Sequence, residues 1–280
     1  MKIVLVGKRG SKRASKIAQN NNCDLIEYDF QEFADGSSQA ILDSIPRNNK
    51  VLLFYEFSKP MDIDGIRVLR LINLLQKHEN QVILIAPFMP FIREKDEGNT
   101  DSWFLFKDVK IVTIDAHAKR PNLISLQPEF FAAHILQDDL IIIPDTGAMR
   151  YIINGLLYDK HENIEYVVAK KDRVHGVRFL AEDIEKIKNR NCIILDDIVD
   201  SGYTLRSTIE IIKANGAKKI DACITHNLNE NIDYLAWGLD SLFICGTLLQ
   251  EGNYTKIFDP TDLLVGLGEF FGDFDIVGRH

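Results

Sequence analysis

The chain has 280 residues, 46% of them hydrophobic, so it is long enough to bury a large core in one or two domains. Its formal net charge of -8 argues against a nucleic-acid partner held by bulk electrostatics, but local loops and helix N-termini can still bind small anions. No apolar run approaches the roughly 20 residues that a membrane-spanning helix needs.

The first apolar segment, Lys2–Val6, is followed at once by Lys8, Arg9, Lys12 and Arg13. A secretory signal peptide would have a longer apolar region that ends at small residues. We therefore interpret this segment as a β-strand and expect a cytoplasmic protein that contacts no membrane. The four cysteines form no CxxC pair, which favours core thiols over a zinc site or a disulfide framework.

Short apolar segments alternate with helix-like segments along most of the chain. Near-continuous apolar strands of this kind are typical of parallel sheets that are covered by helices on both faces. The expected strands are Lys2–Val6, Asp24–Tyr28, Val51–Tyr55, Gln81–Ala86, Val109–Thr113, Leu140–Pro144, Tyr166–Ala169, Asn191–Leu195, Lys219–Thr225 and Ser241–Cys245. Helical periodicity is present in Asp64–His78 and in Leu205–Ala214, and Asn215-Gly216 is the expected stop of the second helix.

This pattern predicts an α/β protein with two sheets of about five strands each. We place the domains at residues 1–137 and 138–280, with the division near Leu136–Asp139. The tail from about residue 258 is apolar enough to dock as a helix on the first domain. Two polar stretches, Arg93–Ser102 and Arg173–Phe179, are expected to be loops.

The segment between the strand Asn191–Leu195 and the helix Leu205–Ala214 is rich in acids and hydroxyls. In an open parallel sheet, ligands bind beyond the carboxyl ends of the strands, where helices begin. Helix-start N–H groups and hydroxyls suit a phosphate, and carboxylates suit ribose hydroxyls and a magnesium ion. The segment therefore predicts a ribose 5-phosphate pocket; the alternative is an acidic helix N-cap after a core strand. The candidate binding residues are Asp196, Asp197, Asp200, Ser201, Gly202, Tyr203 and Thr204.

This segment closely resembles the phosphoribosyl-binding signature of type I phosphoribosyltransferases and of ribose-phosphate diphosphokinase, also called phosphoribosyl pyrophosphate (PRPP) synthetase. Five further segments resemble the second family in the expected order. They are Glu32–Gly36, Ile85–Asp96, Ile114–His117 followed by Phe130-Phe131, Pro144–Arg150 and Lys170–Arg173. The resemblance spans nearly the whole chain and implies two similar phosphoribosyltransferase-like domains, each a mainly parallel sheet flanked by helices.

The resemblance also implies roles for individual residues. The ATP contacts would be Phe33, Asp35, Arg93, Glu94 and His117. The pyrophosphate loop would consist of Asp145, Thr146 and Gly147, and magnesium would be held by Asp115, His117 and Asp145. The catalytic pair would be Lys171 and Arg173. Mobile cations can neutralise the charge that develops during transfer of a diphosphoryl group.

Each of these segments also has an ordinary structural interpretation. Phe33 could belong to the core, Asp35 could form a turn, and Arg93 could be a solvated surface residue. Asp115 and His117 follow a strand two residues apart, so in extended chain they would point to the same side.

The chain departs from the family pattern at several of these segments. Ser37 stands where the family has a loop glutamate, Glu94 where it has glutamine, and Ala148 replaces the second glycine of the pyrophosphate loop. In the ribose segment, Ser201 replaces the usual threonine and Tyr203 a common glycine. These changes affect the nucleotide side of the predicted site more than the ribose side.

The expected function is therefore a magnesium-dependent ribose-phosphate diphosphokinase, which makes PRPP and AMP from ribose 5-phosphate and ATP. Two alternatives remain: a phosphoribosyltransferase that consumes PRPP, and a non-catalytic relative that binds ligands or partners. The resemblance further implies a homo-oligomer, a dimer or higher, with ATP sites shared between subunits through the Phe33 loop. No nucleic-acid partner is expected.

Overall fold

The computed structural model describes residues 1–93, 102–145, 149, 164–172, 176–229, 231–248 and 252–271. The chain divides into two compact units: Met1–Leu126 together with the chain from Pro260 onward, and Gln127–Asp259. The division thus lies earlier in the chain than Leu136–Asp139. The reason is local, because Phe130 and His134 stack on Phe258 and Phe243 of the second unit, with ring centroids 4.5 Å and 4.6 Å apart.

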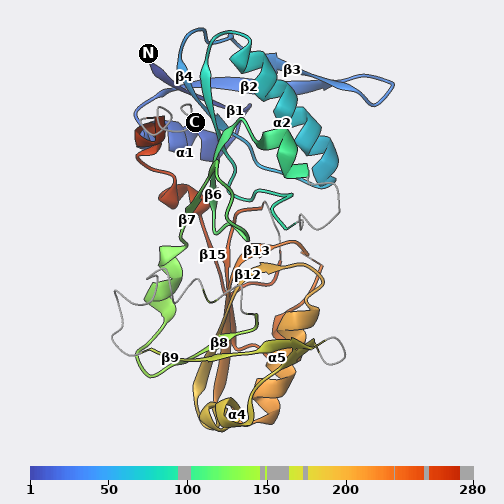
Figure 1. Cartoon of the computed structure of the whole chain (residues 1–280), viewed down its shortest axis with the longest axis vertical. Coiled ribbons are helices and arrows are strands. Elements are labelled where there is room, and N and C mark those ends of the chain that lie inside the picture. The colour runs from blue at the N-terminus through green and yellow to red at the C-terminus, as the bar shows by residue number, and fades with distance from the viewer. Residues whose placement is uncertain are drawn as a thin grey trace. The chain divides into compact units, whose positions relative to one another are not determined.

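The first unit is built on a seven-stranded sheet with the order β3-β2-β1-β4-β5-β6-β7 (Figure 1). Its strands are β1 (Ile3–Lys8), β2 (Asp24–Glu32), β3 (Ser38–Leu42), β4 (Lys50–Phe54), β5 (Gln81–Ile85), β6 (Lys110–Ile114) and β7 (Leu123–Leu126). Neighbouring strands are parallel, except that β3 pairs antiparallel with β2 at the edge. β2 and β3 therefore form a hairpin.

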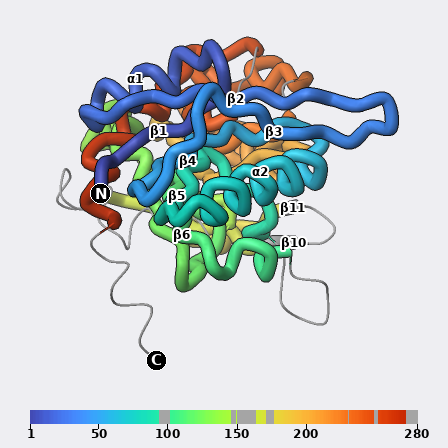
Figure 2. Tube along the Cα trace, turned by 90° about the horizontal axis from the view of Figure 1, so that it is seen from above, coloured from blue at the N-terminus to red at the C-terminus, as the bar shows by residue number. Residues whose placement is uncertain are grey.

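Within the described residues of this unit, two α-helices, α1 (Lys12–Asn20) and α2 (Met61–Gln76), cover opposite faces of the sheet, as Figure 2 shows. Successive side chains of a strand point to opposite faces. Accordingly Val51 and Leu53 pack in the cluster that contains α2, while Leu52 and Phe54 pack in the cluster that contains α1.

The end of the chain packs on the α1 face as two 3₁₀ helices, Pro260–Leu263 and Leu267–Phe271, instead of the expected single helix. Asn21, the C-cap of α1, fixes this segment from both sides. Its side-chain amide donates to the Leu264 carbonyl over 2.9 Å, and its side-chain oxygen accepts from the Leu267 N–H over 2.7 Å.

The second unit has a six-stranded, wholly parallel sheet with the order β15-β14-β13-β12-β8-β9. Its strands are β8 (Leu140–Ile143), β9 (Glu165–Val168), β12 (Asn191–Val199), β13 (Lys219–Asn227), β14 (Ser241–Cys245) and β15 (Lys256–Phe258). A separate antiparallel hairpin consists of β10 (Lys170–Asp172) and β11 (Gly176–Arg178). The α-helices in the described part of this unit are α4 (Ala181–Ile187) and α5 (Tyr203–Ala214), and α5 packs on the core face of β8, β12 and β13. Further 3₁₀ helices are Ser102–Phe106 in the first unit and Glu129–His134 and Leu235–Trp237 in the second.

All ten expected strands and both expected helices are present, and the fold class is confirmed as α/β with two mainly parallel sheets flanked by helices. The helix stop is also confirmed, because α5 ends at its C-cap Asn215 and Gly216 has a φ of +79°. The loop expected at Arg173–Phe179 is wrong in part, because Gly176–Arg178 form β11. Within the described residues, no helix is both long and apolar enough to span a bilayer. Three of the four cysteines are buried free thiols, and the fourth, Cys23, is half-buried.

Candidate functional site

The acidic pair of the ribose segment lies inside the sheet. β12 continues to Val199, past the expected end at Leu195, so Asp196 and Asp197 are strand residues. Their exposed fractions are 8% and 4%. The Asp197 N–H donates to the Asp196 carboxylate over 3.0 Å. Burying two carboxylates side by side is costly, and a bound cation, a shared proton or hydroxyl partners would offset that cost.

A third carboxylate lies at the same edge of the sheet. β8 and β12 are parallel, with Ile142 opposite Ile194, so Asp145 follows β8 near the acidic pair. Burial raises the pKa of Asp196 well above its usual range, and the negative charges of Asp197 and Asp145 raise it further. The structure thus places Asp145, which follows β8, at the same sheet edge as Asp196 and Asp197, which lie on β12.

The turn after the acidic pair has the geometry of an anion site. Gly202 adopts a left-handed conformation with φ +77° and precedes the first residue of α5, and its carbonyl accepts from the Arg206 N–H over 2.8 Å. The Tyr203 N–H points to the Ser201 hydroxyl at 3.4 Å. N–H groups of the first helical turn have no intrahelical acceptor and lie at the positive end of the helix dipole. Together with the Ser201 and Thr204 hydroxyls, they suit a phosphate.

One wall of this turn is a residue that the sequence analysis did not identify. A Cβ atom on Gly202 would lie 2.6 Å from the Trp237 ring, so the indole excludes any side chain there. Trp237 packs edge-on against Tyr234, whose hydroxyl donates to the Asn227 side chain over 2.7 Å. No local pattern relates Trp237 to the turn, because the two meet only after β13 has folded beside β12.

The proposed catalytic residue Lys171 lies on the β10–β11 hairpin, opposite Val177. β11 lies against α5, the helix that begins at the candidate phosphate turn. The hairpin and the turn are therefore connected through one helix. Four predicted residues, Glu94, Thr146, Gly147 and Arg173, lie outside the described residues.

In the first unit, the predicted adenine-contacting segment is the loop between β2 and β3, residues 33–37. It projects beyond the rest of the unit (Figure 2). Phe33 is 44% exposed, so its ring does not belong to the core. The Phe33 N–H donates to the Ser37 carbonyl over 2.9 Å, and Gly36 has a φ of +80°. The loop is thus an ordered turn that presents an aromatic ring to its surroundings.

Asp35 shapes this loop from within. Its carboxylate accepts hydrogen bonds from the Ser37 N–H at 2.9 Å and from the Ser37 hydroxyl at 2.7 Å, and the two bonds lower the pKa of Asp35. Ser37, which replaces the family's glutamate, therefore stabilises the turn. Asp35 has the turn-forming function that was the alternative to an adenine contact, and one of its oxygens is occupied by that function.

A row of aromatic rings connects the base of this hairpin to the turn that carries Arg93. Neighbouring ring centroids lie between 5.1 and 6.5 Å apart along the row. The rings are Phe30, Tyr28, Tyr55, Phe57, Phe91 and Phe106. Arg93 itself is exposed, two residues after Phe91. Edge-to-face and offset ring pairs of this kind add stability beyond the area they bury, so the row stabilises the packing between the hairpin base and this turn.

The geometry expected for Asp115 and His117 is wrong. Asp115 has a φ of +48°, so the chain turns there and does not continue in extended form after β6. Asp115 is fully buried, and its N–H donates to the Leu126 carbonyl over 2.8 Å, whereas His117 is exposed. Among the residues that the structure describes, no three His, Cys, Asp or Glu side chains are grouped to hold a metal ion.

Comparisons with known proteins find similar sequences and a similar fold. The family model described as "Phosphoribosyl transferase domain" matches residues 145–237, which include Asp145, the acidic pair and Trp237. The ribose-phosphate pyrophosphokinase of Thermotoga maritima is 22% identical over 286 residues, which cover 91% of this chain and 89% of that protein. Ribose-phosphate pyrophosphokinase 1 of Listeria monocytogenes is 22% identical over 236 residues, 76% of this chain and 74% of the relative.

A solved structure is similar over the whole chain. The crystal structure of phosphoribosylpyrophosphate synthetase from Mycobacterium smegmatis superposes with a TM-score of 0.81 at 19% identity, covering 99% of this chain and all of that one. At this level of identity, the similarity establishes the fold.

Proposed function

We propose that this chain, a distant ribose-phosphate pyrophosphokinase-like protein with a phosphoribosyltransferase domain, transfers the diphosphoryl group of ATP to the 1-hydroxyl of ribose 5-phosphate. The products are PRPP and AMP. The observation that carries the proposal is the edge of the second sheet, where buried carboxylates lie directly before a glycine turn and a helix start. A sugar phosphate carries hydroxyls and an anionic group close together, so it would use the carboxylates and the helix start at the same time.

Each part of this edge has a task in the reaction. The backbone N–H groups and hydroxyls at Ser201–Thr204 bind the 5-phosphate. Burial and the neighbouring Asp197 raise the pKa of Asp196, which favours a proton on the carboxylate pair. It can then accept a hydrogen bond from one ribose hydroxyl and donate one to another. The sugar is thereby oriented with its 1-hydroxyl toward the transferred group.

On the nucleotide side, the exposed ring of Phe33 stacks on adenine, and Arg93 and His117 contact the phosphates. Asp35 keeps the adenine loop in shape. Lys171 and Arg173 close over the transferring group and neutralise the charge that develops on its oxygens. Magnesium, with Asp115, His117 and Asp145 as candidate donors, supplies charge neutralisation on the polyphosphate when it is bound.

The direct test is to incubate the full chain with ribose 5-phosphate, ATP and magnesium and to measure AMP and PRPP. We expect equal amounts of both, and a loss of about a thousandfold in kcat for Lys171→Ala, since charge neutralisation is a large part of phosphoryl-transfer catalysis. Ribose 5-phosphate binding is followed separately through the fluorescence of Trp237, in a Trp103→Phe background that leaves this indole as the one reporter.

The outcomes distinguish the proposal from its rivals. A wild-type chain that forms no AMP but makes a nucleotide from PRPP and a base is a phosphoribosyltransferase. The family match to residues 145–237 favours that rival, because it covers only the half with the ribose turn. A chain that binds ribose 5-phosphate, as reported by Trp237, without any turnover is a non-catalytic relative.

A further inference from the structure

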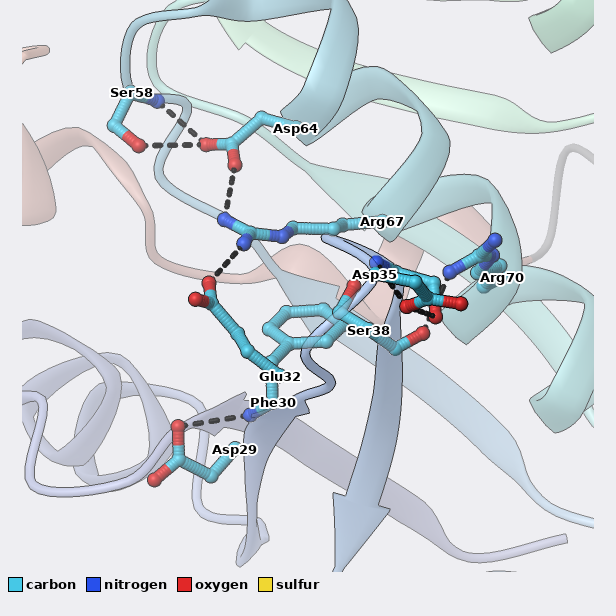
Figure 3. Close-up of polar contacts among 10 residues, drawn as sticks. Asp29, Phe30, Glu32, Asp35, Ser38, Ser58, Asp64, Arg67 and Arg70 are labelled. Carbon is cyan, nitrogen blue, oxygen red and sulfur yellow. Dashed lines mark hydrogen bonds and ion pairs between the residues drawn. The ribbon is translucent and has the colours of Figure 1, made fainter.

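Helix α2 presents two arginines to the β2–β3 hairpin. Arg67 and Arg70 are three residues apart and therefore lie on the same face of the helix. α2 also contacts β3, the edge strand of the sheet. Figure 3 shows both side chains extended from the helix toward the hairpin.

Arg67 holds the first strand of the hairpin. One guanidinium nitrogen donates to the carboxylate of Glu32, the last residue of β2. The guanidinium also lies over the Phe30 ring, 5.4 Å from its centroid. The charge-assisted hydrogen bond to Glu32 and the cation–π contact with Phe30 both hold the end of β2 against Arg67.

Arg67 is itself held in place by a buried anion. Its other terminal nitrogen donates over 3.3 Å to Asp64, whose side chain is only 6% exposed. The second oxygen of Asp64 accepts from the N–H and the hydroxyl of Ser58, at 2.7 and 2.8 Å (Figure 3). The ordered segment before α2 therefore fixes the direction of the guanidinium.

Arg70 holds the second strand. It donates to the carbonyl oxygen of Ser38, the first residue of β3, over 2.6 Å. Glu32 and Ser38 are directly opposite each other in the ladder and form the last pair before the loop 33–37. The two arginines thus hold the entry and the exit of the loop that presents Phe33.

We propose that Arg67 and Arg70 are positioning residues that preorganise the β2–β3 loop for a nucleotide. A two-stranded hairpin that projects from a sheet is only marginally stable by itself. Fixing its last residue pair to a helix places the exposed ring of Phe33 before any ligand arrives, so binding does not have to order the loop. The inference rests on the proposed function, in which the loop contacts the adenine of ATP.

The test compares Arg67→Ala, Arg70→Ala and the double variant with Arg47→Ala, an exposed arginine between β3 and β4 that serves as the matched control. Amide hydrogen exchange of the peptide covering residues 30–38 is measured in the full chain without ligand. We expect exchange to accelerate about tenfold in the double variant and less in each single variant, because the loop opens more often. Arg47→Ala should exchange like the wild type.

Kinetics and binding give the second measurement. The Michaelis constant for ATP should rise about tenfold in the double variant, with kcat and the Michaelis constant for ribose 5-phosphate within twofold of wild type. Calorimetry with ATP and magnesium should show the same loss of affinity in the absence of ribose 5-phosphate. Arg67→Lys should restore affinity only in part, because an ammonium group cannot bond Glu32 and Asp64 as a planar fork does. A purely structural defect would instead lower kcat and the melting temperature.

Two results would overturn the inference. One is unchanged exchange in the double variant; the other is faster exchange with unchanged ATP affinity. If the proposed function is wrong, the wild type itself will form no AMP and bind no ATP, which is a different result from either of these. An active wild type whose arginine variants all behave like Arg47→Ala removes this inference alone.

Discussion

The ribose turn of the second unit and the β2–β3 loop of the first unit have similar backbones but opposite surroundings. Both follow a strand and contain a left-handed glycine, Gly202 with φ +77° and Gly36 with φ +80°. At Gly202 a Cβ atom would meet the Trp237 ring at 2.6 Å, whereas at Gly36 it would meet nothing within 4 Å. Steric fit therefore determines the ribose turn, and polar contacts determine the nucleotide loop.

Asp196 of the ribose segment and Asp35 of the nucleotide loop also differ in their surroundings. Asp196 is buried, and burial and neighbouring acids raise its pKa. Asp35 is exposed, and two bonds from Ser37 lower its pKa. Burial thus disfavours the charged form of Asp196, whereas hydrogen bonds within its own loop favour the charged form of Asp35. The stability of the ribose turn should therefore respond to changes in side-chain size and in pH. The order of the nucleotide loop should respond to salt and to loss of Arg67 and Arg70.

The largest expected effect comes from adding one methyl group at each glycine. Gly202→Ala should lower the free energy of unfolding by about 3 kcal/mol and raise the Michaelis constant for ribose 5-phosphate about a hundredfold, because backbone strain and a clash add together. Gly36→Ala should cost only about 1 kcal/mol, from the left-handed backbone alone. Urea denaturation and steady-state kinetics measure both effects.

A second substitution identifies the clash as the cause. Trp237→Ala removes the ring that a methyl group at residue 202 would meet, so it should recover part of the stability lost in Gly202→Ala. Equal losses in Gly202→Ala and Gly36→Ala, or no recovery in the double variant, would contradict the contrast between the two loops.

The next largest expected effect is a dependence of the free energy of unfolding on pH, caused by Asp196 in the second unit. A carboxyl group whose pKa is higher in the folded than in the unfolded chain binds more protons when folded. Its stabilisation is therefore complete below the unfolded pKa and is lost as the pH rises toward the folded pKa. From about pH 5 upward, wild type should lose stability relative to Asp196→Asn by up to about 1.4 kcal/mol per pH unit.

Urea denaturation between pH 5 and pH 8 tests this dependence. Asp200→Asn is the control, because Asp200 lies on the same segment but is exposed. Its stability should follow that of wild type across the range. Parallel curves for wild type and Asp196→Asn would show that the pKa of Asp196 is not raised by folding.

The smallest expected effect is the response of the two loops to salt. Raising sodium chloride from 0.1 to 1 M shortens the Debye length from about 10 to about 3 Å and weakens exposed ion pairs. Amide exchange of residues 30–38 should therefore accelerate about threefold, since the Arg67–Glu32 contact is partly exposed. Exchange of residues 196–208 should not change. The Arg67→Ala, Arg70→Ala double variant should have lost the salt response, and a response that persists in it would locate the effect elsewhere.

Much of the fold follows from local patterns. The apolar strands and the two long helices were predictable because each has its own periodicity and stop signals, such as Asn215-Gly216. The strands that escaped prediction are short or polar, as in β3 and β11, and owe their conformation to pairing with a neighbour. The backbone turn at Asp115 was not predicted either, because the aspartate side chain does not by itself indicate a left-handed conformation after a strand.

The sequence by itself determined that the chain is α/β, that an acidic, hydroxyl-rich segment joins a buried strand to a helix, and which known families this resembles. These properties reside in neighbouring residues and in their order. Only the tertiary structure decided that Asp145 lies beside Asp196 and Asp197, that Trp237 excludes a side chain at Gly202, and that Arg67 and Arg70 hold the Glu32–Ser38 pair. Each of these contacts joins residues that are far apart in the chain. Strand register and helix docking bring them together, and neither is encoded at any single position.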